Sequence, residues 1–222
     1  RSLLEAFPLL TARGGPSKIG GVPLSYFLGG FMTRRTGSMV LGVIAALAVS
    51  SSAQAQSVYF GGGIAIPMGT FKDEVKTGWI GTAGLTVDIG KAGAFFDAEL
   101  FYGSHSHKGT SAYTTAYSDK TNLTAGIAAL GYSFGKAGQK VRPYILAGGG
   151  VLNHQFKSTN PANSADVGSD LAFAYTGAAG LVFELSSKAS FWVEGRYLAG
   201  TGANKDTKVL PLTAGVSIKV GK

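Results

Sequence analysis

Apolar residues occupy every second position over most of the chain from about residue 58 onward. In the last and most regular stretch, Leu210, Leu212 and Ala214 alternate with small or polar residues such as Thr213 and Gly215. Strict alternation over five or more residues is typical of a β-strand with two different faces. The pattern predicts eight strands, and the alternating runs cover residues 58–66, 82–89, 96–102, 121–134, 141–151, 173–184, 191–197 and 210–220.

The fourth run changes phase in its middle. Its apolar positions are odd-numbered at first and even-numbered later: Leu123, Ala125 and Ile127, then Leu130, Tyr132 and Phe134. An extra residue in one strand of a pair shifts the alternation by one. We therefore expect a β-bulge within this run.

The connections between the runs alternate in length. The short ones lie near residues 91–93, 136–140 and 186–189, and the long polar ones cover 67–78, 105–120, 157–169 and 200–207. Even numbers of antiparallel strands joined by alternately short turns and long loops are typical of outer-membrane barrels. The predicted fold is all-β: an eight-stranded antiparallel up-and-down transmembrane β-barrel.

The face opposite the apolar one separates this barrel from a secreted lipocalin-like binder, which is the soluble alternative. That face holds mostly Gly, Ala, Ser, Thr and Tyr, with few charges, and the whole chain is 45% hydrophobic and 14% charged. Such a face suits a narrow polar lumen better than a surface in water. Aromatic residues near the run ends predict two interfacial girdles, with Trp79, Phe101, Tyr102, Phe173 and Tyr175 toward the loops and Phe95, Phe96, Phe183 and Phe191 toward the turns.

The N-terminal part of the sequence has the organisation of an export signal. Arg34 and Arg35 precede an apolar run at 39–49, and Ala53-Gln-Ala55 follows it. A basic segment, a short apolar core and small residues around a cleavage point define a secretory signal peptide. We expect a signal at 32–55 with cleavage between Ala55 and Gln56, an upstream extension at 1–31 outside the mature protein, and a barrel domain at 56–222.

Composition removes several classes of function. The chain has no Cys, which excludes disulfides, thiolate metal sites and cysteine nucleophiles. The net charge of +8 falls to about +4 after residue 55, where 15 Lys and Arg face 11 Asp and Glu. We therefore expect no nucleic-acid partner.

Three segments carry a resemblance to a known family: the opening Val58-Tyr-Phe-Gly-Gly-Gly, the stretch from Arg142 to Gly150 (RPYILAGGG), and the last run. The chain resembles the small outer-membrane β-barrel proteins that include the OmpX-like proteins and the transmembrane domain of OmpA. The resemblance implies a location in the bacterial outer membrane and recognition by the barrel assembly machinery. The last run is similar to the assembly signal of that family at Thr213, Gly215, Ile218 and Val220, although the family usually ends on Phe or Trp.

Charged residues share the face predicted to line the lumen: Asp88, Asp97, Glu99, Arg142, Glu184, Glu194, Arg196 and Lys219. Both signs are present, and an eight-stranded interior is only wide enough for side chains. We expect a paired charge cluster that fills the barrel, because a buried ion needs a partner. The alternative is a narrow channel for ions or protons.

Enzymatic chemistry has little support in the sequence. The chain has three histidines, at positions 105, 107 and 154, and two imidazoles without a carboxylate nearby make a weak metal site. We expect exposed histidines, no metal and no cofactor. A lipid-modifying enzyme with a Ser and a His is a less favoured alternative, because Ser104 and Ser106 alternate with the two histidines and face away from them.

The predicted function is a structural or surface-interaction role in the bacterial envelope, in contact with outer-membrane lipid and as a monomer. The loop at 105–120 is rich in Tyr, Ser, Thr and Gly. Such a loop suits adaptable recognition of an extracellular ligand, and equally a solvated loop without a partner. Both interpretations stay open for the four long loops.

Overall fold

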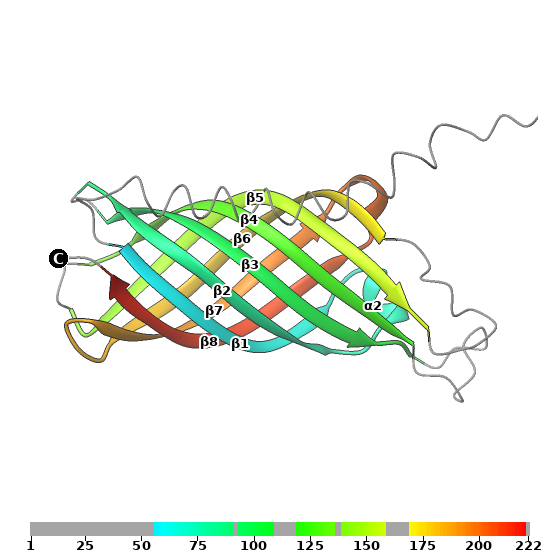
Figure 1. Cartoon of the computed structure of the whole chain (residues 1–222), viewed down its shortest axis with the longest axis horizontal. Coiled ribbons are helices and arrows are strands. Elements are labelled where there is room, and N and C mark those ends of the chain that lie inside the picture. The colour runs from blue at the N-terminus through cyan, green and yellow to red at the C-terminus, as the bar shows by residue number, and fades with distance from the viewer. Residues whose placement is uncertain (1–55, 91–92, 109–118, 136–138, 159–168, 221–222) are drawn as a thin grey trace, which may run out of the picture. The chain divides into compact units, whose positions relative to one another are not determined.

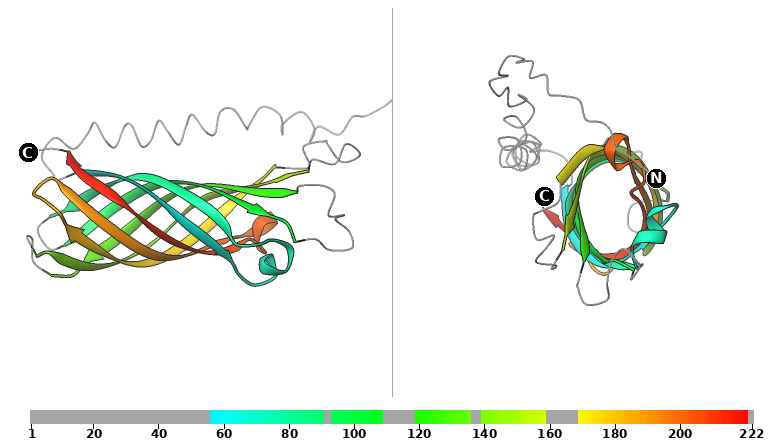
Figure 2. Two further views of the ribbon diagram at one scale, coloured as in Figure 1. Left: turned by 90° about the horizontal axis from the view of Figure 1, so that it is seen from below. Right: turned by 90° about the vertical axis from the view of Figure 1, so that its right-hand side faces the viewer.

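The computed structural model describes residues 56–90, 93–108, 119–135, 139–158 and 169–220, which all lie in one compact unit. Eight strands form a closed barrel in which every strand pairs with its neighbours in sequence and β8 pairs with β1 (Figure 1). The bounds are β1 Gln56–Pro67, β2 Gly78–Ile89, β3 Ala94–Ser106, β4 Lys120–Ser133, β5 Val141–Lys157, β6 Ser169–Glu184, β7 Ala189–Gly200 and β8 Lys208–Val220. The view along the axis shows the strands as a closed ring (Figure 2). The predicted fold class is confirmed.

Two short helices lie at the end of the barrel that carries the long connections. Helix α2, Phe71–Glu74, follows β1, and the 3-10 helix η1, Gly202–Asn204, follows β7. In the part of the chain that the structure describes, no helix has the length and apolar character needed to cross a bilayer.

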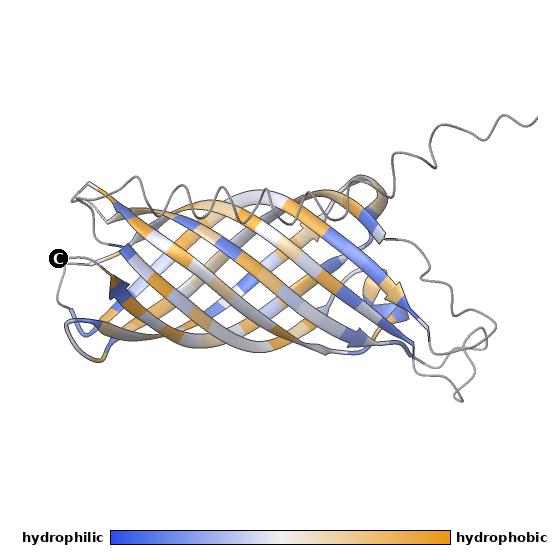
Figure 3. Cartoon of the chain, in the orientation of Figure 1, coloured by the Kyte–Doolittle hydropathy of each residue, from blue (hydrophilic) through white to orange (hydrophobic). Residues whose placement is uncertain are grey.

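Hydropathy alternates along the strands (Figure 3), and the large apolar residues of the alternation are exposed on the outer wall. Phe60, Leu130 and Phe173 expose 55%, 63% and 57% of their surface there. An apolar outer wall needs lipid rather than water around it. Trp79, Tyr102 and Tyr175 are also exposed, as predicted for a girdle, but Phe95 and Phe101 are buried inside the barrel because their positions have the opposite parity.

The bulge expected in β4 is absent, and that prediction was wrong. The pairing of β4 advances one residue at a time, from Lys120 to Tyr132 with β3 and from Lys120 to Ser133 with β5. Leu123, Ala125 and Ile127 instead point into the barrel, where they are buried. The strand is regular because the interior at the loop end is itself apolar.

The ladder between β7 and β8 has one interruption. Pairing runs from Ala189↔Ile218 to Gly195↔Leu212 and resumes at Leu198↔Val209. Pro211 falls within the gap, and its lack of an N–H removes one rung donor. The other neighbour of β8 is unaffected, since Ala65 of β1 pairs with Pro211.

Candidate functional site

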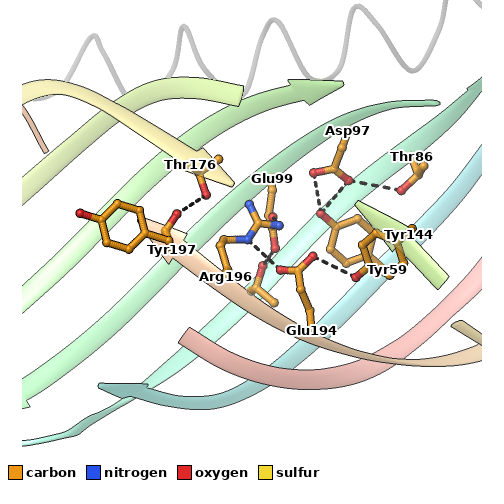
Figure 4. Close-up of polar contacts among 10 residues, drawn as sticks. Tyr59, Thr86, Asp97, Glu99, Tyr144, Thr176, Glu194, Arg196 and Tyr197 are labelled. Carbon is orange, nitrogen blue, oxygen red and sulfur yellow. Dashed lines mark hydrogen bonds and ion pairs between the residues drawn. The ribbon is translucent and has the colours of Figure 1, made fainter. Parts of the chain in front are cut away.

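A network of charged and phenolic side chains crosses the middle of the barrel (Figure 4). The guanidinium of Arg196 binds two carboxylates, with Nη2 2.6 Å from Glu99 Oε2 and Nε 2.7 Å from Glu194 Oε1. Tyr144 donates from its hydroxyl to Glu194 Oε2 at 2.9 Å, and Thr82 donates to Glu99. Arg196 and Glu99 are each 2% exposed in their side chains. These contacts come from β2, β3, β5 and β7, so they tie opposite walls together.

A third buried carboxylate, Asp97, lies beside this network. Tyr59 donates its hydroxyl hydrogen to Asp97, with 2.9 Å to Oδ1 and 3.1 Å to Oδ2, and Thr86 donates to Oδ1 at 3.3 Å (Figure 4). Asp97 is buried. The tyrosine hydroxyl and the threonine replace the water that this carboxylate would otherwise bind.

The remaining charged residues of the predicted set lie toward the short turns. Glu184 Oε1 lies 3.0 Å from Arg142 Nη2 and 3.3 Å from Lys219 Nζ. These side chains are 16–35% exposed, so they are accessible to solvent at the end of the barrel. Asp88 lines the same cavity as Arg142 and Lys219 but is exposed. The eight residues therefore form a buried central group and a separate group at the turn end.

The loop half of the lumen is filled with apolar side chains. Phe71 of α2 and Val75 belong to a buried cluster that fills this half, together with Ala65, Ile80, Phe101, Leu123, Ala125, Ile127, Leu152, Ala174, Leu198 and Val209. Arg196 lies under this layer, with its guanidinium carbon 4.8 Å from the centre of the Phe101 ring. Phe71 and Val75 thus fill the loop end of the lumen.

Backbone hydrogen bonds hold the segment around α2 against the ends of β3 and β8. Val75 forms an isolated antiparallel bridge with His107. The amide of Lys76 donates to Ser106, that of Lys108 to Glu74, and that of Met68 to Lys208. Across the mouth, Asn204 of η1 donates its side-chain amide to the carbonyls of Leu152 and Asp170. The loop end is therefore closed by ordered backbone as well as by side chains.

The expectation of exposed histidines was wrong. His105 is fully buried, and His107 and His154 are partly buried. The rings of His105 and His154 lie edge-on to Phe71, at 5.5 and 5.9 Å between centroids. His105 lies 3.0 Å from the Lys76 carbonyl through Nδ1, and His107 lies 2.8 Å from Thr121 Oγ1 through Nε2. The two histidines beside Phe71 are covered because loop segment 68–77 folds inward over them.

The pKa of the His107 imidazole lies below its usual value. Burial is the largest cause, and His105 adds to it, while the carboxylates of Asp119 and Glu74 oppose the shift. No group of three His, Asp or Glu side chains among the described residues could hold a metal ion.

The sequence profile of the outer membrane protein β-barrel domain matches residues 39–219, which is most of the chain. The chain belongs to this family. The protein is accordingly an outer-membrane β-barrel protein of the bacterial envelope, as the resemblance implied. No curated protein sequence matches the chain.

Solved structures of other bacterial proteins share the fold at low sequence identity. Neisserial surface protein A has a TM-score of 0.55 and 16% identity, over 75% of this chain and 99% of its own. A major outer membrane protein of Thermus thermophilus has a TM-score of 0.51 and 12% identity, and the match covers 76% of this chain and 100% of its own. The attachment invasion locus protein Ail of Yersinia pestis was solved with the heparin analogue sucrose octasulfate. It has a TM-score of 0.50 and 12% identity, and the match covers 75% of this chain and 99% of its own.

Four residues predicted as a family assembly signal lie on both faces of β8. Thr213 is buried inside the barrel, and Gly215 lies against the ring of Trp192. Ile218 and Val220 are 49% and 52% exposed on the outer wall. The two apolar side chains are thus accessible to another membrane protein.

The predicted cleavage site is only partly described. Ala53 and Ala55, together with the signal peptide and the upstream extension, lie outside the described residues. Gln56 is the first residue of β1 and pairs with Val87 of β2 and with Val220 of β8. The barrel therefore begins directly after the predicted cleavage point.

Several residues of the site were not singled out from the sequence. Tyr59, Tyr144 and Trp192 lie at positions that the alternation assigns to the lumen. The alternation does not predict which side chains these aromatic residues contact across it. Phe71 and Val75 are large apolar residues four apart in a polar segment. That spacing is the available sequence signal for the inward-facing α2.

Proposed function

We propose that the protein is a non-conducting and non-enzymatic barrel that has a structural role in the outer membrane and presents its loop end to the surroundings. One observation carries this proposal: an apolar layer beneath α2 and the ion-paired layer around Arg196 follow one another along the lumen. Ions need polar groups or water to replace their hydration shell. The apolar layer supplies few such groups, and the polar groups of the charge layer are already engaged with one another.

Planar-bilayer recording of the purified protein tests this role against the narrow channel. We expect no reproducible conductance steps. A variant with Phe71→Ala and Val75→Ala, which thins the apolar layer, serves as a comparison. Regular steps in the unmodified protein that respond to these substitutions would replace the structural role with a channel.

The loop end supports a second, more specific role in surface binding. Lys120 of β4 and Lys157 of β5 lie directly opposite each other in the ladder, and both are exposed. Like charges in this arrangement repel each other, so an anionic partner would stabilise them. Ail, which has the same fold, was solved with a sulfated heparin analogue. We therefore include sulfated or otherwise polyanionic ligands as partners of the loops at 67–78, 105–120, 157–169 and 200–207.

Retention on immobilised heparin tests this second role. A variant with Lys120→Gln and Lys157→Gln should elute at lower salt than the unmodified protein, because two phosphate- or sulfate-binding charges are lost. A variant with Lys140→Gln and Lys188→Gln, both near short turns, is the control with the same loss of charge. Equal elution of the two double variants would exclude the lysine pair as a binding site.

The family also implies a route to the membrane, which we include in the proposal. The signal at 32–55 would direct export, and Thr213, Gly215, Ile218 and Val220 would be read by the barrel assembly machinery. A monomer suits a closed barrel, because every strand is already paired and no edge is available to another chain. Replacing Ile218 and Val220 by Ser in cells would test the recognition, with Val58→Ser as an outer-wall control.

A further inference from the structure

The turn half of the lumen holds a cavity, in contrast to the filled loop half. It has a volume of about 130 Å³, and its lining extends to Asp88, Arg142 and Lys219 at the turn end. Its walls include the rings of Tyr59, Phe95, Tyr144 and Trp192, and its inner end is formed by Glu99 and Arg196. A water-sized group needs about 10–15 Å³ by this measure. The cavity thus has room for about ten such groups.

The walls present hydrogen-bond donors that have no partner among the described residues. Trp192 is 6% exposed, and its Nε1–H has no acceptor among the described residues. Arg196 is 2% exposed, and its Nη1 also has no acceptor there. Both residues line the cavity. A buried donor without an acceptor costs free energy, so an acceptor that reached either atom from the cavity would stabilise the protein.

The same walls also present acceptors. Asp97 and Glu194 line the cavity, and each carboxylate has about four lone-pair positions. Asp97 receives hydroxyl hydrogens from Tyr59 and Thr86, and Glu194 binds Tyr144 and Arg196, so both have acceptor capacity left. A ligand that fits must both accept and donate, which is the property of a hydroxyl group.

The aromatic rings give the cavity an apolar side as well. Tyr59 and Trp192 meet edge to face with 5.7 Å between centroids, and Phe95 and Tyr144 do so at 6.1 Å. Such rings pack well against C–H groups. A molecule with hydroxyl groups at its edge and C–H groups on its faces matches both parts of the wall.

The charges rank the ligands of this kind. Four carboxylates line the cavity, from Asp88, Asp97, Glu99 and Glu194, against three cations from Arg142, Arg196 and Lys219. Glu184 adds a further carboxylate bound to Arg142 and Lys219. The excess of negative charge disfavours an acidic ligand and favours one with an amine.

We propose that this cavity binds a small polyhydroxyl molecule about the size of one monosaccharide, with an amino sugar preferred over a neutral sugar and a neutral sugar over an acidic one. Short turns of outer-membrane barrels face the periplasm, so the ligand enters from that side. The binding is independent of the structural role and of the loops, because an apolar layer separates the cavity from the loop end.

The fluorescence of Trp192 tests the proposal, because the chain has two tryptophans and the other, Trp79, lies on the outer wall. The protein is purified from outer membranes as the Trp79→Phe variant, in a detergent without a sugar headgroup. Glucosamine, glucose and glucuronate are then titrated in the millimolar range. We expect saturable changes in emission, with affinity falling in that order.

Calorimetric titration of variants locates the binding. Trp192→Phe keeps a ring but removes the donor, and should weaken glucosamine binding about tenfold. Ser190→Leu places an apolar side chain in the cavity and should abolish it, while Trp79→Phe should leave it unchanged. The proposal is overturned if no sugar binds saturably, or if folded Trp192→Phe and Ser190→Leu proteins bind as the unmodified protein does. In the first case ordered water alone satisfies the buried donors.

Discussion

Phe71 lies edge-on to the imidazole of His105, with ring centroids 5.5 Å apart and the ring planes at 71°. Both residues are buried, one on a loop helix and the other on β3. This contact joins a segment outside the barrel wall to the interior of the barrel. The closure of the loop end therefore depends on side chains that are distant in sequence.

Replacing Phe71 by Ala should loosen the segment around α2 while the strands stay folded. A buried Phe→Ala change costs about 3–5 kcal/mol in a core, and here the loss acts on the loop segment because the ladders are unaffected. Trypsin should cleave faster after the exposed Lys72 and Lys76. Met68→Ala, at an exposed position of the same segment, is the control. Equal cleavage of both variants would show that Phe71 does not hold the segment.

Acid should weaken the bridge between Val75 and His107. The folded protein holds the pKa of His107 below its ordinary value of 6.5, chiefly through burial. The unfolded segment therefore binds a proton more readily, and the stabilisation present above pH 6.5 is lost as the pH falls from there toward the lowered pKa of the folded state. Hydrogen exchange of the Lys76 and Lys108 amides, corrected for intrinsic rates, should show less protection at about pH 5 than at about pH 7.

The matched variant for this prediction is His107→Gln. Glutamine keeps a side chain that can bind Thr121 but does not titrate in this range, so the protection of the two amides should become independent of pH. A pH dependence that persists in the variant would assign the effect to another group.

Removing Arg196 should destabilise the barrel more than neutralising one of its partners. Arg196→Met leaves Glu99 and Glu194 buried without a counter-ion. Removing one partner of a buried ion pair lowers the free energy of unfolding by about 3–5 kcal/mol. Glu99→Gln keeps a hydrogen-bonding group and leaves one carboxylate with Arg196, so it should cost less. Urea unfolding of the protein in lipid vesicles measures both. Arg142→Met, at a side chain that is 24% exposed, should have the smallest effect of the three.

Replacement by Ala should destabilise the barrel at one glycine, Gly61, and leave its stability almost unchanged at another, Gly177. A Cβ on Gly61 would lie 2.6 Å from the Trp192 ring and 2.5 Å from the Ala214 carbonyl oxygen, so Gly61→Ala should cost about 1–3 kcal/mol or prevent folding. A Cβ on Gly177 would meet only the Leu146 carbonyl oxygen at 3.9 Å, so Gly177→Ala should be close to neutral. The gel mobility of unheated samples compares the folded fractions, and similar losses for both would contradict the packing argument.

The wall of the barrel could be predicted from the sequence because lipid acts on it uniformly. Positions such as Phe60, Phe173 and Leu212 must be apolar whatever their neighbours are, and the parity of seven runs follows from that. Only in β4 does the apolar pattern change parity while the strand stays regular, since Leu123 and Ile127 serve the interior and the outer wall there is made by small residues such as Gly126 and Ala128.

The interior could not be predicted in the same way, because its contacts depend on which strands meet across the lumen. Parity alone places Arg196 and Glu99 inside. Their pairing depends on the stagger of β3 against β7, two strands that are not neighbours in the ladder. Likewise, the inward fold of α2 depends on an apolar space at the loop end, and that space is made by residues from several strands.

The gap at Pro211 gives the C-terminal strand two unequal attachments. On one side β8 is held to β1 by an unbroken ladder, and on the other its ladder to β7 is broken between Leu212 and Val209. If the chain is pulled from Val220, the rungs to β7 open first up to Leu212, and the next stretch of β8 is held by ladder hydrogen bonds to β1 alone. Mechanical extraction of this strand would therefore proceed in two stages, with the ladder beside β7 giving way before the ladder beside β1.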